Sequence, residues 1–513
     1  MPNRRQFLTT TAGAGLLGYL PCPTMLPSGT PVTMAELAVT PDIVRLNADI
    51  EPIVRLIEQT PRKKCFDMIS QQLQQGLPYR QFLAALYLAG IRNVNPQPPG
   101  FKFHCVFVIH SAHQVSLETP VKDRLLPLFW ALDNFKASQQ RDVEEGDFKL
   151  KPVHEQKTLS SGDVAWKEFH DAMDQWDEAK ADRAIVNLVR HCSAHQMIEQ
   201  LWQYGARDYR NIGHKAIFVA NTWRTLQTIG WHHAEPALRS LVLGLLDFGK
   251  SLRVNDYAFE DQSFLANVEL VDRNIHQLPG NWTTHRNAVE VTKMLLEIIR
   301  SGKTADACST ALRELQSQRT GAPEIWDAVH LAAGELMMQQ QGIYGIHTVT
   351  SVNALRYAYQ TAADLKTRML MLLQAIGWMC QFRKFMSGKR QGLKKLKITE
   401  LEPVETPQRS RDALDDIFAL VATNAPQAAA KAMTYAGRHP QLTSFSRFAQ
   451  QLILRKATDA HDYKYAVSIF EDYRQVSSPW RPHMLATSTF HLRGSTLPDS
   501  PIMNRAMEVI RSL

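Results

Sequence analysis

The stretch "DAHDYKYAVSIFEDY", residues 459–473, places a histidine and a lysine three positions apart in a segment with helical periodicity. At positions i and i+3, His461 and Lys464 share one face, and the apolar residues that follow indicate that this face could be buried. Burial would favour the neutral amine of Lys464, because a desolvated ammonium is costly. A neutral amine reacts with carbon dioxide to give a carbamate, whose oxygens can bind a metal. The two residues are therefore a candidate metal site.

A solvated Lys464 is the alternative interpretation. The residues three and four positions away on a helix are not acidic, so they offer the ammonium no local ion pair; they are Ala460, His461, Val467 and Ser468. An ion pair would need Glu471, two turns further on, or an acidic residue from another segment. The sequence leaves both interpretations open.

Histidines in apolar helical surroundings are informative, because a buried imidazole needs a hydrogen-bond partner or a metal. The segment "HCVFVIHSAHQ" carries three of the 18 histidines, His104, His110 and His113. A helix would bring His110 and His113 to within about 60° of each other, whereas a strand over 104–110 would place His104 and His110 on one face. Periodicity does not decide between the two structures.

Further histidines of this kind lie later in the chain. His214 follows Gly213 at an expected helix start, His233 follows the same helix, and His330 and His347 lie in two neighbouring helical segments. Each of them, taken alone, is explained by an ordinary core or capping role. Because separate helices of a bundle can direct such side chains to one interior point, several of them together predict an interior histidine-lined site.

A local stripe in "HCSAHQMIE" is a separate candidate. On one continuous helix, His191, His195 and Glu199 at i, i+4 and i+8 would lie on one face. Two imidazoles and a carboxylate can bind zinc or iron. Since no HExxH motif is present here, a solvated helix face is the favoured interpretation.

The segments that carry these residues have apolar positions at three- and four-residue spacing, as in "DIVRLNADIEPIVRLIEQT" and "AVEVTKMLLEIIRSG". Convincing alternating strands are hard to find, and no repeat of fixed period occurs. The predicted fold is mainly α, a large multi-helix array with an interior histidine-lined site. Residues 41–513 are expected to form a helical catalytic domain, with a candidate subdivision near 300–320.

The beginning of the chain, "MPNRRQFLTTTAGAGLLGYLPCPTM", resembles a twin-arginine export signal, because Arg4 and Arg5 precede Phe7, Leu8 and a weak apolar run. Residues 1–40 are therefore expected to be a signal and linker, with the twin-arginine export machinery as a partner and the periplasm as the compartment. The apolar run is shorter than the roughly 20 residues that span a bilayer, so no stable membrane span is expected.

The composition is ordinary for a globular protein, with 44% hydrophobic and 21% charged residues and a net charge of +8 over 513 residues. The densest basic cluster, residues 383–397, contains no aromatic residue after Phe385, which disfavours a nucleic-acid surface. The six cysteines form no CxxC motif, so a zinc ribbon is not indicated.

Three blocks in order, "IGHKAIF", "GIHTVTSVNAL" and "DAHDYKYA", resemble the questin oxidase-like family. These helical proteins include a non-haem iron oxygenase with histidine ligands and a carboxylated lysine. The resemblance covers scattered short blocks between residues 100 and 470. It implies iron as the metal, with zinc or manganese as alternatives, and His214, His347 and a carboxylated Lys464 as ligands, with His461 nearby.

The remaining ligands stay open under this resemblance. The early ligand could be His113, His110 or His104, and His233 and His330 compete for another place. No catalytic residue is assigned. The candidate metal ligands are therefore His113, His214, His233, His330, His347, His461 and Lys464.

The resemblance implies a metal-dependent oxygenase whose substrate is an aromatic or polyketide-like small molecule, and the signal-like N-terminus adds the expectation that it is exported. Aromatic residues that could wall its pocket are Trp223, Trp231, Trp326, Tyr344 and Tyr357, and charged residues that could surround the ligands are Arg210, Arg224 and Glu235. Two other functions stay open: a metal-dependent hydrolase at the same site, and a non-enzymatic helical periplasmic protein. The sequence does not determine the oligomeric state.

Overall fold

A computed structural model describes residues 44, 46–153, 162–248 and 259–511. The expected signal and linker, residues 1–40, lie outside the described residues. The chain from Val44 onward belongs to one unit of packed helices. Residues 300–320 include the whole of the helix Thr304–Gln316, which packs against the long helix Leu365–Ser387 of the same unit.

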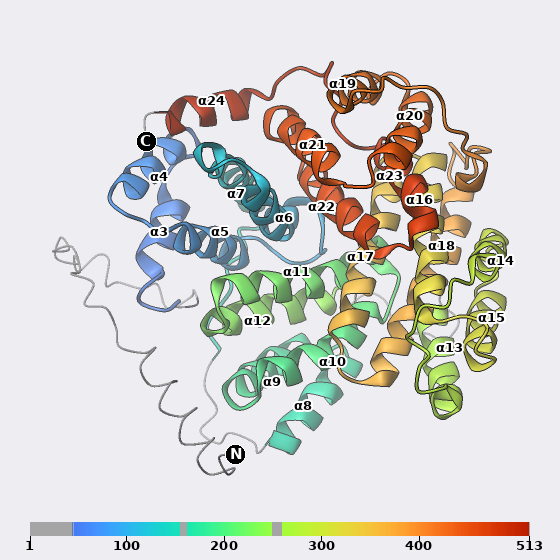
Figure 1. Ribbon diagram of the computed structural model, residues 1–513. Helices are drawn as coiled ribbons and strands as arrows, with labels where there is room; N and C mark the ends of the chain where they lie inside the picture. Colours follow the sequence, from blue (N-terminus) through green and yellow to red (C-terminus); the bar gives the residue numbers. More distant parts are fainter. Residues whose placement is uncertain (1–43, 45, 154–161, 249–258, 512–513) are drawn as a thin grey trace, which may run out of the picture. The chain divides into compact units, whose positions relative to one another are not determined.

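The described residues form α-helices and short 3₁₀ turns, with no β-strand among them (Figure 1). The first ten α-helices are α3 (Glu51–Gln59), α4 (Cys65–Gln74), α5 (Tyr79–Asn93), α6 (His104–Glu118), α7 (Leu126–Glu145), α8 (Gly162–Asp174), α9 (Glu178–His191), α10 (Ala194–Ala206), α11 (His214–Ile229) and α12 (Ala234–Leu245).

The second half of the chain continues in the same way. Its α-helices are α13 (Phe259–Asn274), α14 (Val289–Arg300), α15 (Thr304–Gln316), α16 (Ala322–Gln339), α17 (Ile343–Thr361), α18 (Leu365–Ser387), α19 (Ser410–Leu420), α20 (Ala425–Arg438), α21 (Thr443–Lys456), α22 (Ala460–Gln475), α23 (Arg481–Ser488) and α24 (Pro501–Ile510). The prediction of a mainly α, multi-helix array is confirmed.

Inner and outer helices differ in how much of their surface is buried. Along α16, nearly every residue from Ala322 to Gln339 is buried, and the first half of α17 is buried in the same way. Outer helices such as α14 bury one stripe only, which is the amphipathic pattern of a helix that covers a core. The inner helices therefore supply side chains that water does not reach.

Four of the inner helices surround the site described below. In Figure 1, α6, α11, α17 and α22 lie next to one another: α6 contacts α11 and α22, and α17 contacts the same two helices. Long stretches of chain separate them in the sequence. The segment "HCVFVIHSAHQ" forms the first eleven residues of α6, so its helical interpretation applies and the strand does not.

The predicted stripe of His191, His195 and Glu199 is wrong, because the helix is interrupted between the two histidines. α9 ends at His191, and Ser193 caps the N-terminus of α10. The hydroxyl of Ser193 accepts from the Gln196 backbone N–H, while the Gln196 side chain accepts from the Ser193 N–H. In a continuous helix, these backbone N–H groups would donate to carbonyl oxygens of the preceding turn. Here the side chains of the capping box accept from them instead, so a new helix begins at this point.

None of the described helices is both long enough and apolar enough to cross a membrane.

Candidate metal centre

Four histidines from four helices meet in the interior. The potential ligand atoms of His104, His214, His347 and His461 all lie within 4.8 Å of one another. His104 and His214 are the first residues of α6 and α11, His461 is the second residue of α22, and His347 is the fifth residue of α17. His104, His214 and His347 are buried, and the His461 side chain is 12% exposed.

Each of the four rings is held through its Nδ1 atom. The Nδ1 atoms of His104, His214 and His347 lie 2.8, 2.6 and 2.6 Å from backbone carbonyl oxygens of the preceding turn. The Nδ1 of His461 is hydrogen bonded to the carboxylate of Asp459. Carbonyl and carboxylate oxygens only accept, so each Nδ1 is the donor, and a neutral ring carries its lone pair on Nε2.

These lone pairs face one another at short distances. His214 Nε2 lies 2.8 Å from His347 Nε2 and 3.2 Å from His104 Nε2. Two unprotonated nitrogens at such a separation repel each other unless a cation lies between them. The buried Nε2 of His461 has no hydrogen-bond partner in the structure. The four nitrogens thus present unshared electron pairs to one interior point.

Protons are poor candidates for that cation. Burial, together with the neighbouring positive charges, holds the pKa of His104, His214 and His347 well below its usual value, and burial lowers that of His461 as well. A metal ion fits better, because metal-bound histidines typically donate the other ring N–H to a carbonyl or carboxylate, as all four do here. This buried group could therefore hold a metal ion.

Helix termini add a positive potential at the same point. α6, α11 and α22 begin at or next to a ligand histidine, so three helix N-termini converge on the site. Each N-terminus carries about half a positive charge from its unpaired backbone N–H groups. This potential disfavours protonated imidazoles and favours an anionic group at this point.

Lys464 lies beside the four histidines and is buried, with 2% of its surface exposed. Its charge lowers the pKa of each of the four, which places it close to all of them. Among the described residues the Nζ atom has no hydrogen-bond partner, and it lies 5.5 Å from the centre of the Phe107 ring. Burial lowers the pKa of Lys464 to about 7. The solvated interpretation of this lysine is therefore wrong, and its amine is available for chemistry.

A strained turn sets the position of His214. Asn211 and Ile212 have φ values of 58° and 49°, and Gly213, the N-cap of α11, has a φ of 86°. A Cβ atom on Gly213 would lie 2.6 Å from Ser351 Cβ of α17. Left-handed backbone is costly for residues other than glycine, so such a turn persists only where the surrounding packing imposes it. Here the turn brings the start of α11 against α17.

Replacing Gly213 with alanine is expected to destabilise the protein and to lower its metal content. The left-handed conformation costs alanine about 1–2 kcal/mol, and the contact with Ser351 adds about 1–3 kcal/mol. Gly76→Ala is the matched control, because Gly76 has a φ of 96° but open space around its Cβ position. Urea unfolding and metal analysis of both variants test this; equal effects would contradict the proposed role of the close packing.

Replacing Asp459 with serine is expected to weaken metal binding about 10–100-fold, the usual effect of removing a partner of a ligand histidine. Asp459 orients the His461 ring and also caps α22. Serine keeps the cap, so the metal-free protein should keep its stability. Asp177→Ser at the N-cap of α9 is the control. Metal titrations compare the two, and unchanged affinity in Asp459→Ser would contradict the role of Asp459.

The remaining predicted ligands lie elsewhere. His113 pairs with the hydroxyl of Tyr79, 3.0 Å away. His233 packs against His232, with ring centres 3.9 Å apart and the ring planes tilted by 47°. His330 is buried with no hydrogen bond to either ring nitrogen, and its Nδ1 lies 3.6 Å from an Asp472 carboxylate oxygen. Of the three alternatives for the early ligand, the structure brings His104 to the cluster.

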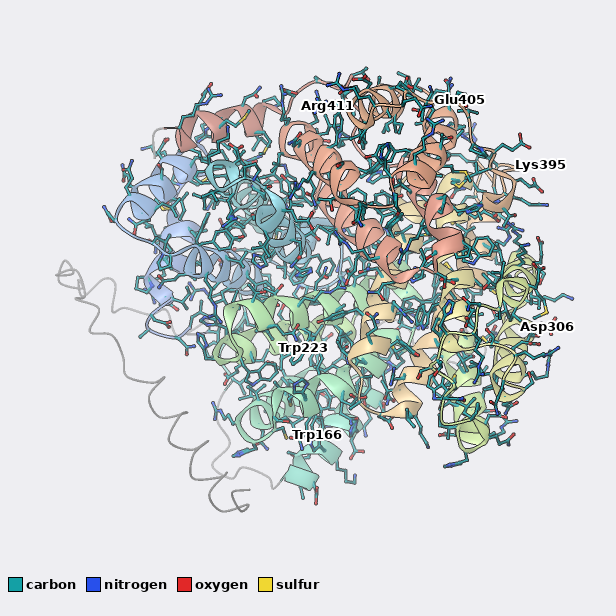
Figure 2. The ribbon with its side chains drawn as sticks, in the orientation of Figure 1. Trp166, Trp223, Asp306, Lys395, Glu405 and Arg411 are labelled. Carbon is teal, nitrogen blue, oxygen red and sulfur yellow. The ribbon has the colours of Figure 1, made fainter. Side chains whose placement is uncertain are left out.

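The predicted pocket residues are also divided. Tyr357 and Arg224 line a cavity between the four helices, described below. Trp223, labelled in Figure 2, instead packs against His195 and Trp231. Among the other predicted residues, Trp326 packs on His330 and Tyr344 on Phe385, Arg210 pairs with Asp261, and Glu235 lies near Arg190.

Sequence reasoning missed Asp459, although a signal for it was present. An aspartate directly before a helix is a preferred N-cap, and its carboxylate can reach the ring of a histidine that lies two positions later in the chain. The backbone carbonyls that hold the other three rings had no comparable signal in the sequence.

Comparison with family models, with curated proteins and with solved structures found no match to this chain. The class that fold and site define is an all-α protein with a buried four-histidine group that could hold a metal ion.

Proposed function

We propose that this protein is an exported non-haem iron oxygenase that acts on an aromatic or polyketide-like organic substrate. The observation that carries the proposal is the set of four Nε2 atoms that face one another in a buried site, each with its Nδ1 held by a protein oxygen. The order of the three sequence blocks that resemble questin oxidase-like proteins agrees with this, because His214, His347 and His461 belong to these blocks.

The choice of iron follows the sequence resemblance, and the spacing of the nitrogens is compatible with iron, manganese or zinc. Two nitrogens bound at about 2.1 Å to one ion lie about 3.0 Å apart at 90° and about 3.4 Å apart at the tetrahedral angle that zinc prefers. The two distances at His214 Nε2 are 2.8 and 3.2 Å; the first is nearer the 90° value and the second lies midway between the two values. Bound ferrous iron would activate dioxygen, and the electron-rich aromatic substrate would supply the electrons that reduce it.

The protein's own residues would prepare the site for this chemistry. The four histidines contribute no charge, so an anionic ligand is needed to balance a divalent metal. Lys464 would supply it: its neutral Nζ attacks carbon dioxide, a carbon–nitrogen bond forms as one carbon–oxygen π bond opens, and the amine loses one proton to water to leave a carbamate. The converging helix N-termini favour this negative charge. The lack of any hydrogen-bond partner for Nζ supports the assignment.

Metal analysis and oxygen uptake together test the proposal. Protein purified without oxygen and loaded with ferrous iron should hold about one ion per chain and consume dioxygen when phenolic aromatic substrates are added. Zinc-loaded protein is the control and should consume none. Hydrolysis of esters or amides at the loaded site without oxygen uptake would instead identify a hydrolase, and absence of metal binding would contradict both functions.

A further inference from the structure

Two connected cavities lie at the far end of the helices that carry the histidines. The arginine vestibule, of about 870 Å³, is lined by Arg124, Arg447, Arg474, Arg481 and Glu118 among others. The inner cavity, of about 380 Å³, is lined by His110, Arg224, Tyr357, Val467, Phe470 and Glu471 among others. Glu118, Gln450 and Arg474 line both, so the two cavities adjoin.

One face of α6 connects the metal centre to these cavities. His104, Phe107, His110, Gln114 and Glu118 follow one another at intervals of three and four residues, so they form a single stripe along the helix. His104 is a candidate metal ligand, His110 and Gln114 line the inner cavity, and Glu118 lies where the two cavities adjoin. At 1.5 Å per residue, the stripe is about 21 Å long.

A second stripe on α22 runs in the same direction. His461, Lys464, Val467, Glu471 and Arg474 are again spaced by three and four residues, from the metal centre through the inner cavity to the vestibule. On the two stripes, Phe107 and Lys464 each follow the histidine of the same helix by three residues, and the Nζ atom of Lys464 lies 5.5 Å from the centre of the Phe107 ring.

The other two helices repeat this order. Arg224 of α11 and Tyr357 of α17 each lie ten residues after the ligand histidine of the same helix, His214 and His347, and both line the inner cavity. All four helices therefore run in the same direction, with the histidines at one end and the cavities about 15 Å further along.

The charges of the vestibule are unbalanced. Its lining contains four arginines and one carboxylate, Glu118, which accepts from Gln450 and lies 3.6 Å from Arg474. Arg124, Arg447 and Arg481 have no carboxylate within 4 Å among the described residues. Unpaired guanidinium groups around a cavity are suited to an anion, which they bind through two parallel hydrogen bonds.

The inner cavity differs, because its charges are already paired. Arg224 donates to both carboxylate oxygens of Glu471, at 2.9 and 2.8 Å, and its guanidinium lies 4.0 Å from the centre of the Tyr357 ring. The rest of the lining is mostly polar, with Phe470 and Val467 as its apolar side chains. Together with the Tyr357 ring, these side chains suit the chamber to an uncharged aromatic body whose hydroxyl or carbonyl groups can hydrogen bond to the polar wall.

We propose that the arginine vestibule and the inner cavity together bind an organic anion that has an aromatic body. The anionic group lies on the vestibule arginines, and the aromatic body enters the inner cavity toward the metal centre. This inference rests on the proposed function in one respect only: it makes the bound anion the substrate. Binding itself requires no metal.

Calorimetry with two matched probes, 2-naphthoate and its uncharged analogue 2-naphthalenemethanol, tests the inference. The wild-type protein should bind naphthoate more tightly than the alcohol. Arg124→Gln and Arg447→Gln should each weaken naphthoate binding about 10-fold and leave binding of the alcohol unchanged. This factor is near the lower end of what a hydrogen bond to a charged group contributes. Arg390→Gln, at an exposed arginine outside both cavities, is the control and should change neither.

Equal affinity for the two probes, or naphthoate binding that neither vestibule variant weakens, would overturn the inference. The same titration of His214→Ala protein separates this inference from the proposed function. Retained naphthoate binding there supports the anion site even if no oxygen is consumed by the wild type. Oxygen consumption with uncharged but not anionic aromatic substrates would uphold the proposed function and overturn the inference.

Discussion

His214→Ala is expected to reduce the metal content from about one ion per chain to less than about a tenth. The Nε2 atom of His214 is the nearest neighbour of two other candidate ligand atoms, those of His104 and His347. Its loss should weaken binding more than about 100-fold, because changes to residues that only support a ligand already cost about 10–100-fold. Elemental analysis of protein purified without chelators measures the effect.

His113→Ala is the matched control for this experiment. It removes a histidine from α6, one of the four helices of the site, but one that pairs with Tyr79. Its metal content should stay at the wild-type value. Thermal unfolding of both variants adds a second readout, since a bound metal stabilises the folded state. Wild-type metal content in His214→Ala would show that the ion lies elsewhere.

Lys464→Met is expected to stabilise the metal-free protein, and by an amount that depends on pH. The pKa of Lys464 falls from 10.5 to about 7 on folding. The unfolded chain therefore binds a proton that the folded chain does not between these values, and the wild type loses stability as the pH falls through this range. Below pH 7 the difference in the free energy of unfolding between Lys464→Met and the wild type levels off at about 5 kcal/mol. This value follows from the shift between 10.5 and about 7, because each pKa unit corresponds to about 1.4 kcal/mol.

Urea unfolding of metal-free protein at pH 7 and pH 10, in buffer without carbon dioxide, measures this difference. Methionine has a similar length and no charge, so it should fill the space of the lysine. Lys395→Met, at an exposed lysine after α18 that is labelled in Figure 2, is the control and should not change stability with pH. A pH-independent effect of Lys464→Met would show that the amine is not held neutral by burial.

The same variant also tests the carbamate. Wild-type protein loaded with zinc, which is diamagnetic, and supplied with ¹³C-bicarbonate should show a carbamate carbon signal by NMR, and Lys464→Met should not. Because the carbamate would supply the one anionic ligand of the site, the variant should bind the metal more weakly than the wild type while its metal-free form is the more stable. Destabilisation and tighter metal binding would contradict this assignment.

The helical fold could be predicted because it follows from local patterns. Apolar residues at three- and four-residue spacing make an amphipathic surface that only a helix can bury, and this spacing occurs throughout the sequence. The prediction was wrong at residues 191–199, where Ser193 and Gln196 end one helix and begin another. Periodicity continued across that break, and the capping residues decided the structure.

The histidine site could be predicted only in part. Helical spacing placed His461 and Lys464 on one face, and their burial made the lysine a candidate for chemistry. Whether His104, His110 or His113 was the early candidate stayed open, since each lies in an apolar run. The structure brings His104 to the cluster, because α6 begins at this residue and its N-terminus meets those of α11 and α22.

The sequence by itself determined the helices, the type of the reactive side chains and the local pairing of His461 with Lys464. Only the tertiary structure decided which histidines meet, because residues 104 and 461 are brought together by packing between helices that are far apart in the chain. His330 and His347 have similar apolar surroundings in the sequence, and both are buried. The long-range contacts of α17 with α11 and α22 direct His347 into the cluster, and no local pattern carries that information.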